Sequence, residues 1–316
     1  MITNRSASDS SIPPERERPI FGLNITPNTD LEKHYLLAKT AEELGLDVIG
    51  IQDHPYNGSY FDTWSLISAL SMSTKRIRYF ADVSDLPMRP PAMLAKASST
   101  LDIITKGRLE LGIGAGSYWD AIHAYGGQRR SPPEAVEAFE EALQIIRLLW
   151  DYGHEGRRRA TFKGKYYQLD NAQTGPRPYH NIRIWVGAIG PRMLRVIGRV
   201  ADGWVIPINT NISTSDIKTG QEIINAALKE NGRSPIAVSR ISNLVGIIDE
   251  EGKFDKSPRE KALFVGSVSD WVEKVNSLYH ELGVDTFVFW PTAQGQEENQ
   301  LRLFAERVVP KVNDSA

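Results

Sequence analysis

Four short segments of the chain combine residue types that could do chemistry. Asp53-His54 joins a carboxylate to an imidazole, and such a pair can act as an acid, a base or a hydrogen-bond partner of a cofactor ring. Asp82-Val83-Ser84-Asp85 places polar residues at the end of an otherwise apolar run. The other two segments, residues 112–117 and 187–192, are rich in glycine. They would bring backbone, rather than side chains, close to a ligand.

The two glycine-rich segments predict different ligand contacts. Residues 112–117 (GIGAGS) look superficially like a dinucleotide-binding fingerprint, but no helix follows at once and the segment ends the fourth predicted strand, not the first. Small residues there would let a flat ring lie against the backbone. Residues 187–190 (GAIG) precede Pro191, which predicts a strand that turns into the start of a helix. The free N–H groups and the dipole of such a turn favour a bound phosphate, and Arg192 could add positive charge.

Each segment also has a plain structural interpretation. Asp53 could cap the next helix while His54 lies at the surface. Residues 82–85 could form an ordinary loop between a strand and a helix. Both glycine-rich segments could be tight turns that hold no ligand. The residues alone leave these alternatives open.

All four segments follow predicted strands, and the order of elements indicates where they meet. Apolar β-rich runs alternate with helical patterns, such as a helix that Asp30 caps and another that opens with a capping box at Ser131. We predict strands at 20–25, 48–53, 77–83, 109–114, 183–188, 203–207, 237–248 and 285–291, and helices at 30–44, 63–71, 91–104, 131–150, 191–200, 213–231, 267–282 and 296–309. Eight such units favour a closed (β/α)8 barrel over a doubly wound open sheet. In a barrel the carboxyl ends of the strands share one mouth, so the four segments should meet there.

Two stretches interrupt the alternation. Residues 151–181 are first charged, then contain an FKGKYYQL pattern and end Pro-rich, which indicates an insertion that could be a hairpin. Residues 249–266 are a second irregular insertion. We therefore expect a single barrel domain over 19–316 with two insertions, preceded by a polar, disordered leader at 1–18 that lacks the apolar run of a signal peptide.

Composition excludes several function classes. The chain has no cysteine, which removes disulfides, thiolate nucleophiles, iron–sulfur clusters and Cys-ligated zinc, and its histidines show no metal-ligand spacing, so we expect no metal. The 37 basic and 39 acidic residues give a net charge of −2, which predicts neither nucleic acid nor an anionic membrane as a partner. No apolar run is long enough to span a membrane, and we expect a cytoplasmic protein.

Taken together, five stretches resemble the luciferase-like monooxygenase family. They are AEELGLDVIGIQDHPY (41–56), LPMRPPAMLAKASSTLDIITKGRLELGIGAGSYWDAIHAYG (86–126), SPPEAVEAFEEALQIIRLLW (131–150), IWVGAIGPRMLRVIGRVADGW (184–204) and VGSVSDWVEKVNSLYHELGVDTFVFWP (265–291). They stand in the family's order across most of residues 20–310, and the second and fourth are the most specific. The resemblance implies a luciferase-like (β/α)8 TIM barrel with insertions that binds FMN or the deazaflavin coenzyme F420 at its C-terminal mouth.

The resemblance also implies roles for the four segments. The cofactor ring would lean on a bulge after the third strand, with a non-prolyl cis peptide between Asp82 and Val83. Residues 187–190 would hold the phosphate, and Asp53 and His54 would lie near the reactive face of the ring as the catalytic pair. The predicted cofactor contacts are Asp82, Val83, Ser84, Gly114, Ala115, Gly116, Gly187, Ala188, Ile189 and Gly190.

The Asp53-His54 pair and the segment GAGSYWDAIHAYGG look more like F420-dependent members than FMN-dependent ones. We therefore expect an F420-dependent oxidoreductase that transfers a hydride between the deazaflavin and a small organic substrate, with Asp53 or His54 moving the proton. F420-dependent sugar-phosphate dehydrogenases carry an acid at the position of Ser117, and its absence argues against a sugar-phosphate substrate. The alternatives are a two-component FMN monooxygenase, which receives reduced FMN from a separate reductase and activates oxygen, and a flavin-binding barrel without activity. The family also implies a homodimer.

Overall fold

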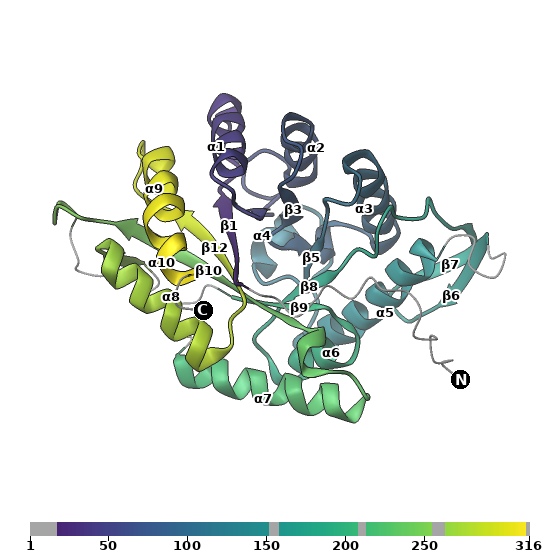
Figure 1. Ribbon diagram of the computed structural model, residues 1–316. Helices are drawn as coiled ribbons and strands as arrows, with labels where there is room; N and C mark the ends of the chain where they lie inside the picture. The colour runs from purple at the N-terminus through teal and green to yellow at the C-terminus, as the bar shows by residue number, and fades with distance from the viewer. Residues whose placement is uncertain (1–17, 152–157, 208–212, 255–262, 314–316) are drawn as a thin grey trace.

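The computed structural model describes residues 18–151, 158–207, 213–254 and 263–313. Within these residues a parallel sheet lies at the centre and helices surround it (Figure 1). The predicted leader lies almost wholly outside the described residues, as do parts of both predicted insertions.

The central sheet closes on itself. Among the described residues, its strands follow one another in the order β3-β2-β1-β12-β10-β9-β8-β5-β4, and β11 pairs with β10 beside this path. The two ends of the order, β3 and β4, are separated only by Asp82 and Val83, and Tyr79 of β3 also bridges to Leu109 in parallel. β3 and β4 are therefore two halves of the third strand, and the predicted (β/α)8 barrel is confirmed. The strands are β1 (Ile20–Ile25), β2 (Val48–Ile51), β3 (Arg78–Ala81), β4 (Ser84–Asp85), β5 (Leu111–Gly114), β8 (Ile184–Gly187), β9 (Gly203–Ile206), β10 (Ser239–Ile248), β11 (Phe264–Gly266) and β12 (Thr286–Pro291).

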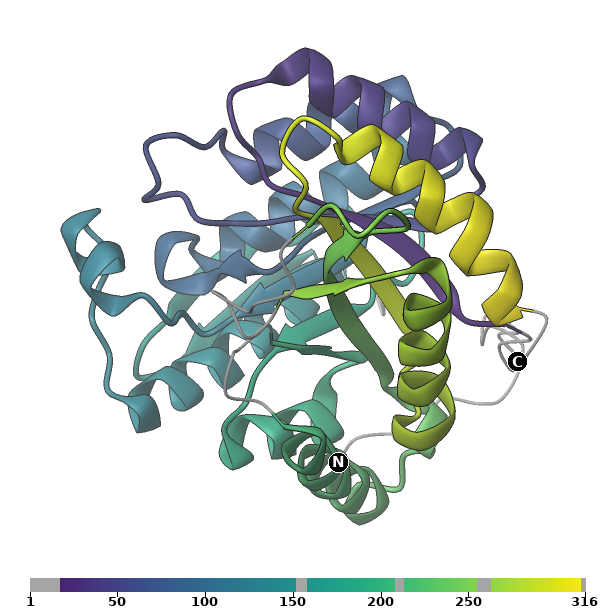
Figure 2. The ribbon, with the colours of Figure 1, turned by 90° about the vertical axis from the view of Figure 1, so that its left-hand side faces the viewer.

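The helices lie on the outside of the barrel, where Figure 2 shows α8 and the C-terminal helices covering the strands. They are α1 (Leu31–Glu43), α2 (Thr63–Ser73), α3 (Pro91–Thr105), α4 (Trp119–Ala124), α5 (Pro132–Trp150), α6 (Pro191–Val200), α7 (Thr214–Glu230), α8 (Val268–Leu282), α9 (Glu297–Leu303) and α10 (Val309–Asn313). A π-helical turn, Phe304–Val308, joins α9 to α10, and short 3₁₀ turns lie at Leu86–Met88 and Pro235–Ala237. Asp30 caps α1 and Ser131 forms a capping box on α5, as predicted. The short α4, in the loop after β5, was not predicted.

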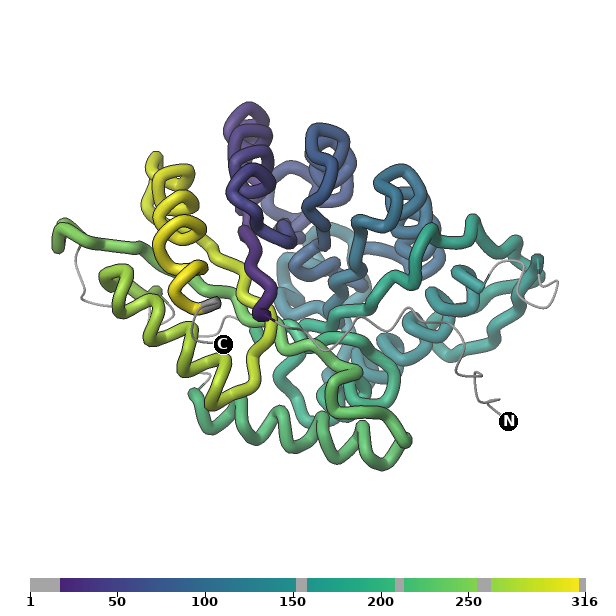
Figure 3. Tube along the Cα trace, in the orientation of Figure 1, coloured from purple at the N-terminus to yellow at the C-terminus, as the bar shows by residue number. Residues whose placement is uncertain are grey.

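The first predicted insertion contains an antiparallel hairpin. Strands β6 (Arg159–Lys163) and β7 (Gln168–Gln173) form a separate two-stranded sheet at the edge of the molecule, which the trace in Figure 3 shows beside α5. The carboxylate of Glu141 on α5 accepts hydrogen bonds from the backbone N–H groups of Lys165, Tyr166 and Tyr167 in the turn. Glu141 therefore attaches the hairpin to the barrel.

The buried apolar side chains form two clusters. The larger one lies between the strands and the surrounding helices. The smaller one fills the inside of the barrel with one residue from each of six strands, namely Val48, Phe80, Trp185, Val205, Ile241 and Val288. A barrel interior packed in this way is a solid core rather than a pore. Any ligand must therefore bind at an end of the barrel.

Candidate active site

The layer above the inner core contains polar side chains and glycines. Side chains alternate along a strand, so the residues two positions beyond the inner core point into the barrel nearer to its C-terminal mouth. These residues are Gly50, Asp82, Gly187, Pro207, Asn243 and Trp290. The inner core thus forms an apolar floor, and polar groups stand on it at the mouth.

Asn24, at the end of β1, joins the polar groups of this layer. Its Nδ2 donates to Asp82 Oδ2 at 2.7 Å and to Asn243 Oδ1 at 3.0 Å, while its Oδ1 accepts from Gln52 Nε2 at 3.0 Å. Burial raises the pKa of Asp82 to about 6, and the hydrogen bonds with Asn243 and Asn24 limit the rise. The network therefore fixes the orientation of the Asp82 carboxyl within this layer.

The peptide bond between Asp82 and Val83 is cis, as the resemblance implied. Val83 lies over the barrel interior, where its Cγ2 would be 2.9 Å from a Cβ built on either Gly114 or Gly187. A larger residue at either glycine would displace Val83. The small size of these two glycines is therefore explained by Val83, and their own contact with a cofactor stays a prediction.

Asp53 is held by three hydrogen bonds. Its Oδ2 accepts from the backbone N–H of Asp85 at 3.0 Å and from Arg89 Nε at 2.8 Å, and its Oδ1 accepts from Arg89 Nη2 at 2.7 Å. The Asp53 side chain is 0% exposed, and Arg89 also donates to Asp62 Oδ2 at 2.6 Å. Because both Asp53 oxygens are engaged, the geometry favours a positioning role over proton transfer, and the catalytic role of Asp53 stays a prediction. The capping alternative for Asp53 is wrong, since Asp62 caps α2 through Ser65.

His54 lies half-buried among tyrosines rather than on an open surface. Its Nδ1 is 2.9 Å from Tyr56 Oη, and its ring centroid lies 5.5 Å from that of Tyr118. Burial lowers the pKa of His54, and the charge of Asp53 only partly offsets this effect. Burial also raises the pKa of Tyr56 above its ordinary value, so Tyr56 stays neutral. Within the described part of the chain Nε2 has no hydrogen-bond partner, so His54 is a neutral imidazole with one ring nitrogen available.

Ser84 faces away from the mouth. Its side chain is buried, and its Oγ accepts a hydrogen bond from Trp64 Nε1 of α2 at 3.1 Å. Because side chains alternate along the strand, Ser84 points outward while Val83 points inward. The Ser84 side chain does not reach the mouth, and a cofactor contact through its backbone stays a prediction.

The loop after β5 is a tight turn. Gly116 has φ +92°, and a Cβ there would lie 2.8 Å from Pro87 Cγ, so both conformation and space favour glycine. Ala115 is half-buried beside it. The turn brings Tyr118 against His54, which shapes the mouth even without a contact between Gly116 and a ligand.

The turn at 187–190 is held by a hydrogen bond near its start and is exposed at its end. Trp204 Nε1 donates to the Ala188 carbonyl at 2.9 Å, which fixes the start of the turn. Ile189 and Gly190 are exposed, and a Cβ on Gly190 would meet no described atom within 4 Å. α6 begins at Pro191, and no side chain in the described part of the chain caps its first turn. Uncapped N–H groups at a helix start can bind an anion, so the predicted phosphate role is compatible with this geometry.

Comparison with known proteins identifies the family. The model of the luciferase-like monooxygenase family matches residues 18–253, well over half of the chain. The chain belongs to this family.

Similar proteins are found among both curated proteins and solved structures. The phthiodiolone/phenolphthiodiolone dimycocerosates ketoreductase of Mycobacterium tuberculosis (strain H37Rv) is 36% identical over 203 residues, covering 63% of this chain and 50% of that protein. The F420-dependent glucose-6-phosphate dehydrogenase of Amycolatopsis mediterranei is 32% identical over 178 residues, covering 53% of this chain and 51% of that protein. The chain thus matches about half the length of these curated relatives. The structure of an F420-dependent secondary alcohol dehydrogenase with an F420-acetone adduct has a TM-score of 0.80 at 19% identity, covering 93% of this chain and 99% of that chain, and this likeness shows the fold.

Several residues at the barrel mouth were not predicted from the sequence. Tyr56, Arg89, Tyr118 and Asn243 all contact groups described above, yet none was a predicted site residue. Asn243 could have been found, because a polar residue at an inward position of a barrel strand stands out once the strand's period is known. Nothing in the sequence indicated that Arg89 would bind Asp53, since 36 residues separate them.

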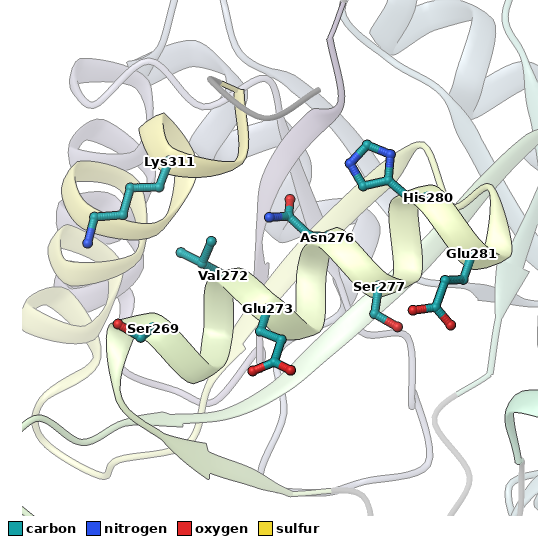
Figure 4. Close-up of a pocket in the computed structure, with 8 residues that line it drawn as sticks. All are labelled: Ser269, Val272, Glu273, Asn276, Ser277, His280, Glu281 and Lys311. Carbon is teal, nitrogen blue, oxygen red and sulfur yellow. The ribbon is translucent and has the colours of Figure 1, made fainter.

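An open depression of about 590 Å³ lies along α8, lined by polar side chains such as Glu273 and His280 together with Lys311 of α10 (Figure 4). It contains none of the predicted site residues. Within the described residues, no group of histidines and carboxylates could hold a metal ion, and no helix is long and apolar enough to cross a membrane.

Proposed function

We propose that this chain is an F420-dependent oxidoreductase that transfers a hydride between the deazaflavin and a small organic substrate. Membership of the luciferase-like family and relatives named as F420-dependent enzymes support the proposal. The observation that carries it is the placement of His54, a half-buried imidazole at the barrel mouth with Nε2 unengaged among the described residues. Such a group suits proton transfer beside a hydride-transferring cofactor.

The residues at the mouth fit a flat ring with a phosphate-bearing tail. Val83 would offer the ring an apolar surface above the floor of the barrel. Residues 187–190 and the uncapped start of α6 would hold the phosphate through backbone N–H groups. When bound, the deazaflavin supplies the hydride chemistry, while the protein supplies orientation and proton transfer.

His54 would move the proton. If Nδ1 carries the hydrogen and donates to Tyr56 Oη, Nε2 is free to accept a proton from a substrate hydroxyl. In the opposite direction Nε2 returns the proton to a carbonyl oxygen. Because its pKa is lowered, His54 stays available as a base at neutral pH and becomes charged only as the pH falls.

Asp53 would position His54 rather than react. Its hydrogen bonds to Arg89 and to the backbone of Asp85 fix the end of β2 against the end of β4. A fixed β2 end fixes the direction of the next residue, His54. Positioning of this kind can matter for rate as much as the reacting group itself.

We propose a secondary alcohol or a ketone as the substrate. The names of the ketoreductase relative and of the structurally similar alcohol dehydrogenase support this class. Tyr56 and Tyr118 form an aromatic wall beside His54 that suits an apolar substrate. Ser117, where sugar-phosphate dehydrogenases of the family carry an acid, argues against a sugar phosphate.

The second candidate is an FMN monooxygenase supplied by a separate reductase. The description of the matched family as luciferase-like monooxygenases supports this second candidate.

A homodimer is also proposed, and exposed apolar side chains on α2 and α3, including Met72 at 68% and Met93 at 61%, would supply part of its interface. Light scattering during gel filtration tests the dimer.

Anaerobic assays with each cofactor separate the two enzymatic candidates. The protein is incubated with F420 and a panel of secondary alcohols, and separately with reduced F420 and the matching ketones. Absorbance reports reduction or oxidation of the cofactor. Turnover without oxygen supports the proposal, whereas turnover only with reduced FMN and oxygen supports the monooxygenase.

A further inference from the structure

Asp85 is a buried carboxyl that the proposed chemistry leaves unexplained. It is 6% exposed, and among the described residues its Oδ1 has no hydrogen-bond partner. A buried carboxyl oxygen without a partner is costly unless a ligand or a proton completes it. Asp85 lies at the mouth, because its backbone N–H donates to Asp53 and the residue before it, Ser84, faces outward to α2. Alternation along the strand therefore turns the Asp85 side chain inward.

The charges around Asp85 disfavour its ionised form. Arg89 faces it from the segment after β4, but this guanidinium is already bound to the carboxylates of Asp53 and Asp62. Asp53 faces it from β2 and brings a like charge, and Tyr56 faces it from the loop after β2. Burial and, to a lesser extent, the charge of Asp53 raise the pKa of Asp85, Arg89 only partly lowers it, and the pKa is about 7 as a result. Because the Arg89 guanidinium is already shared by the carboxylates of Asp53 and Asp62, it does not neutralise a negative charge on Asp85.

We propose that Asp85, in its protonated form, donates a hydrogen bond to a carbonyl oxygen of the bound ligand. A neutral carboxyl carries one O–H donor, and its other oxygen still accepts. The carbonyl belongs either to the ring of the cofactor or to the substrate, and the experiment below separates the two. The identity of this ligand rests on the proposed function, whereas the neutral state of Asp85 does not.

Two variants test whether the Asp85 side chain acts as a hydrogen-bond donor to the ligand. Asp85→Asn keeps the shape and an N–H donor, and Asp85→Leu keeps the approximate size and removes both functions. Asp120→Asn is the matched control, because Asp120 is an exposed carboxylate of α4 that pairs with Arg129. Folding of each variant is checked by its thermal midpoint. Asp85→Leu should fold, because it replaces an unpaired buried polar group.

Binding of FMN and of F420 to each protein is measured by fluorescence, and KM is measured for a ketone with reduced F420. Asp85→Leu should weaken cofactor binding roughly 10-fold if the carbonyl is on the ring, or raise KM roughly 10-fold at unchanged cofactor affinity if it is on the substrate. Asp85→Asn should stay within about threefold of the wild type in both measurements. The donor role is overturned if Asp85→Leu changes neither quantity, or if Asp85→Asn binds as weakly as Asp85→Leu.

A measurement without cofactor tests the neutral state directly. With the pKa of Asp85 raised to about 7, the folded protein keeps a proton that the unfolded chain releases near pH 4. The thermal midpoint of the wild type should therefore fall relative to that of Asp85→Asn as the pH rises from about 4 to about 7. A constant difference over this range would show that Asp85 is ionised and would refute the proposal. If the wild type binds neither cofactor, the proposed function fails, and the stability comparison still decides the state of Asp85.

Discussion

Replacing Asp53 by Asn should destabilise the protein strongly. The Asp53 carboxylate accepts three hydrogen bonds, two of them from Arg89, and its side chain is 0% exposed. Breaking a buried ion pair on one side costs about 3–5 kcal/mol. Arg89 is 18% exposed and keeps its bond to Asp62, so we expect a loss of about 2–4 kcal/mol. At about 2–4 °C per kcal/mol for large domains, the thermal midpoint should fall by about 5–15 °C.

Asp62→Asn is the matched control for this experiment. Asp62 binds the same guanidinium, but its side chain is 43% exposed, and asparagine caps a helix as well as aspartate. We expect a loss of at most about 1 kcal/mol. Thermal and urea unfolding of the three proteins give the comparison. If Asp53→Asn is as stable as Asp62→Asn but has lost turnover, Asp53 acts on the substrate and the positioning role is refuted.

Three further predictions concern other parts of the molecule. His54→Asn should lower turnover by about 10²–10⁴-fold with cofactor affinity and thermal midpoint near those of the wild type, and a loss of affinity with normal turnover would assign His54 to cofactor binding. Gly190→Val should fold normally, because its Cβ meets nothing within 4 Å, but should bind cofactor more weakly in a fluorescence titration; unchanged affinity would make the turn purely structural. At the opposite end of the barrel, burial would lower the pKa of His180, but hydrogen bonds to Asp102 and Glu110 outweigh it and raise the pKa to about 9. The stability that His180 contributes is thus complete below its ordinary pKa of 6.5 and is lost as the pH rises to about 9. The thermal midpoints of the wild type and His180→Gln should therefore converge over that range. Midpoints that change in parallel with pH would contradict the raised pKa.

The barrel could be predicted from the sequence because its signals are local. Each strand is a short apolar run, and each helix carries its own periodicity and caps, so the order of elements follows from nearby residues. The cis bond at Asp82 was implied by family resemblance and not by any local pattern. The split of the third strand into β3 and β4 was not predicted, since no residue within 77–83 marks the point where the strand divides.

The interactions at the mouth could be predicted only in part because they join distant residues. Asp53 and His54 were placed correctly after β2, but their neighbours were not, since Arg89 and Tyr118 reach them from other loops. The glycines were explained by the approach of a ring, whereas in the structure Val83 occupies the space beside Gly114. Spacing along the chain shows where a strand ends, but not which side chain fills the space above it.

The most direct test of the proposed function is anaerobic oxidation of reduced F420 by a ketone, measured by absorbance for the wild type and His54→Asn. Oxidation should require the ketone, proceed without oxygen and fall by about 10²-fold or more in His54→Asn. Absence of oxidation with every ketone, together with oxygen consumption in the presence of reduced FMN, would contradict the proposed function.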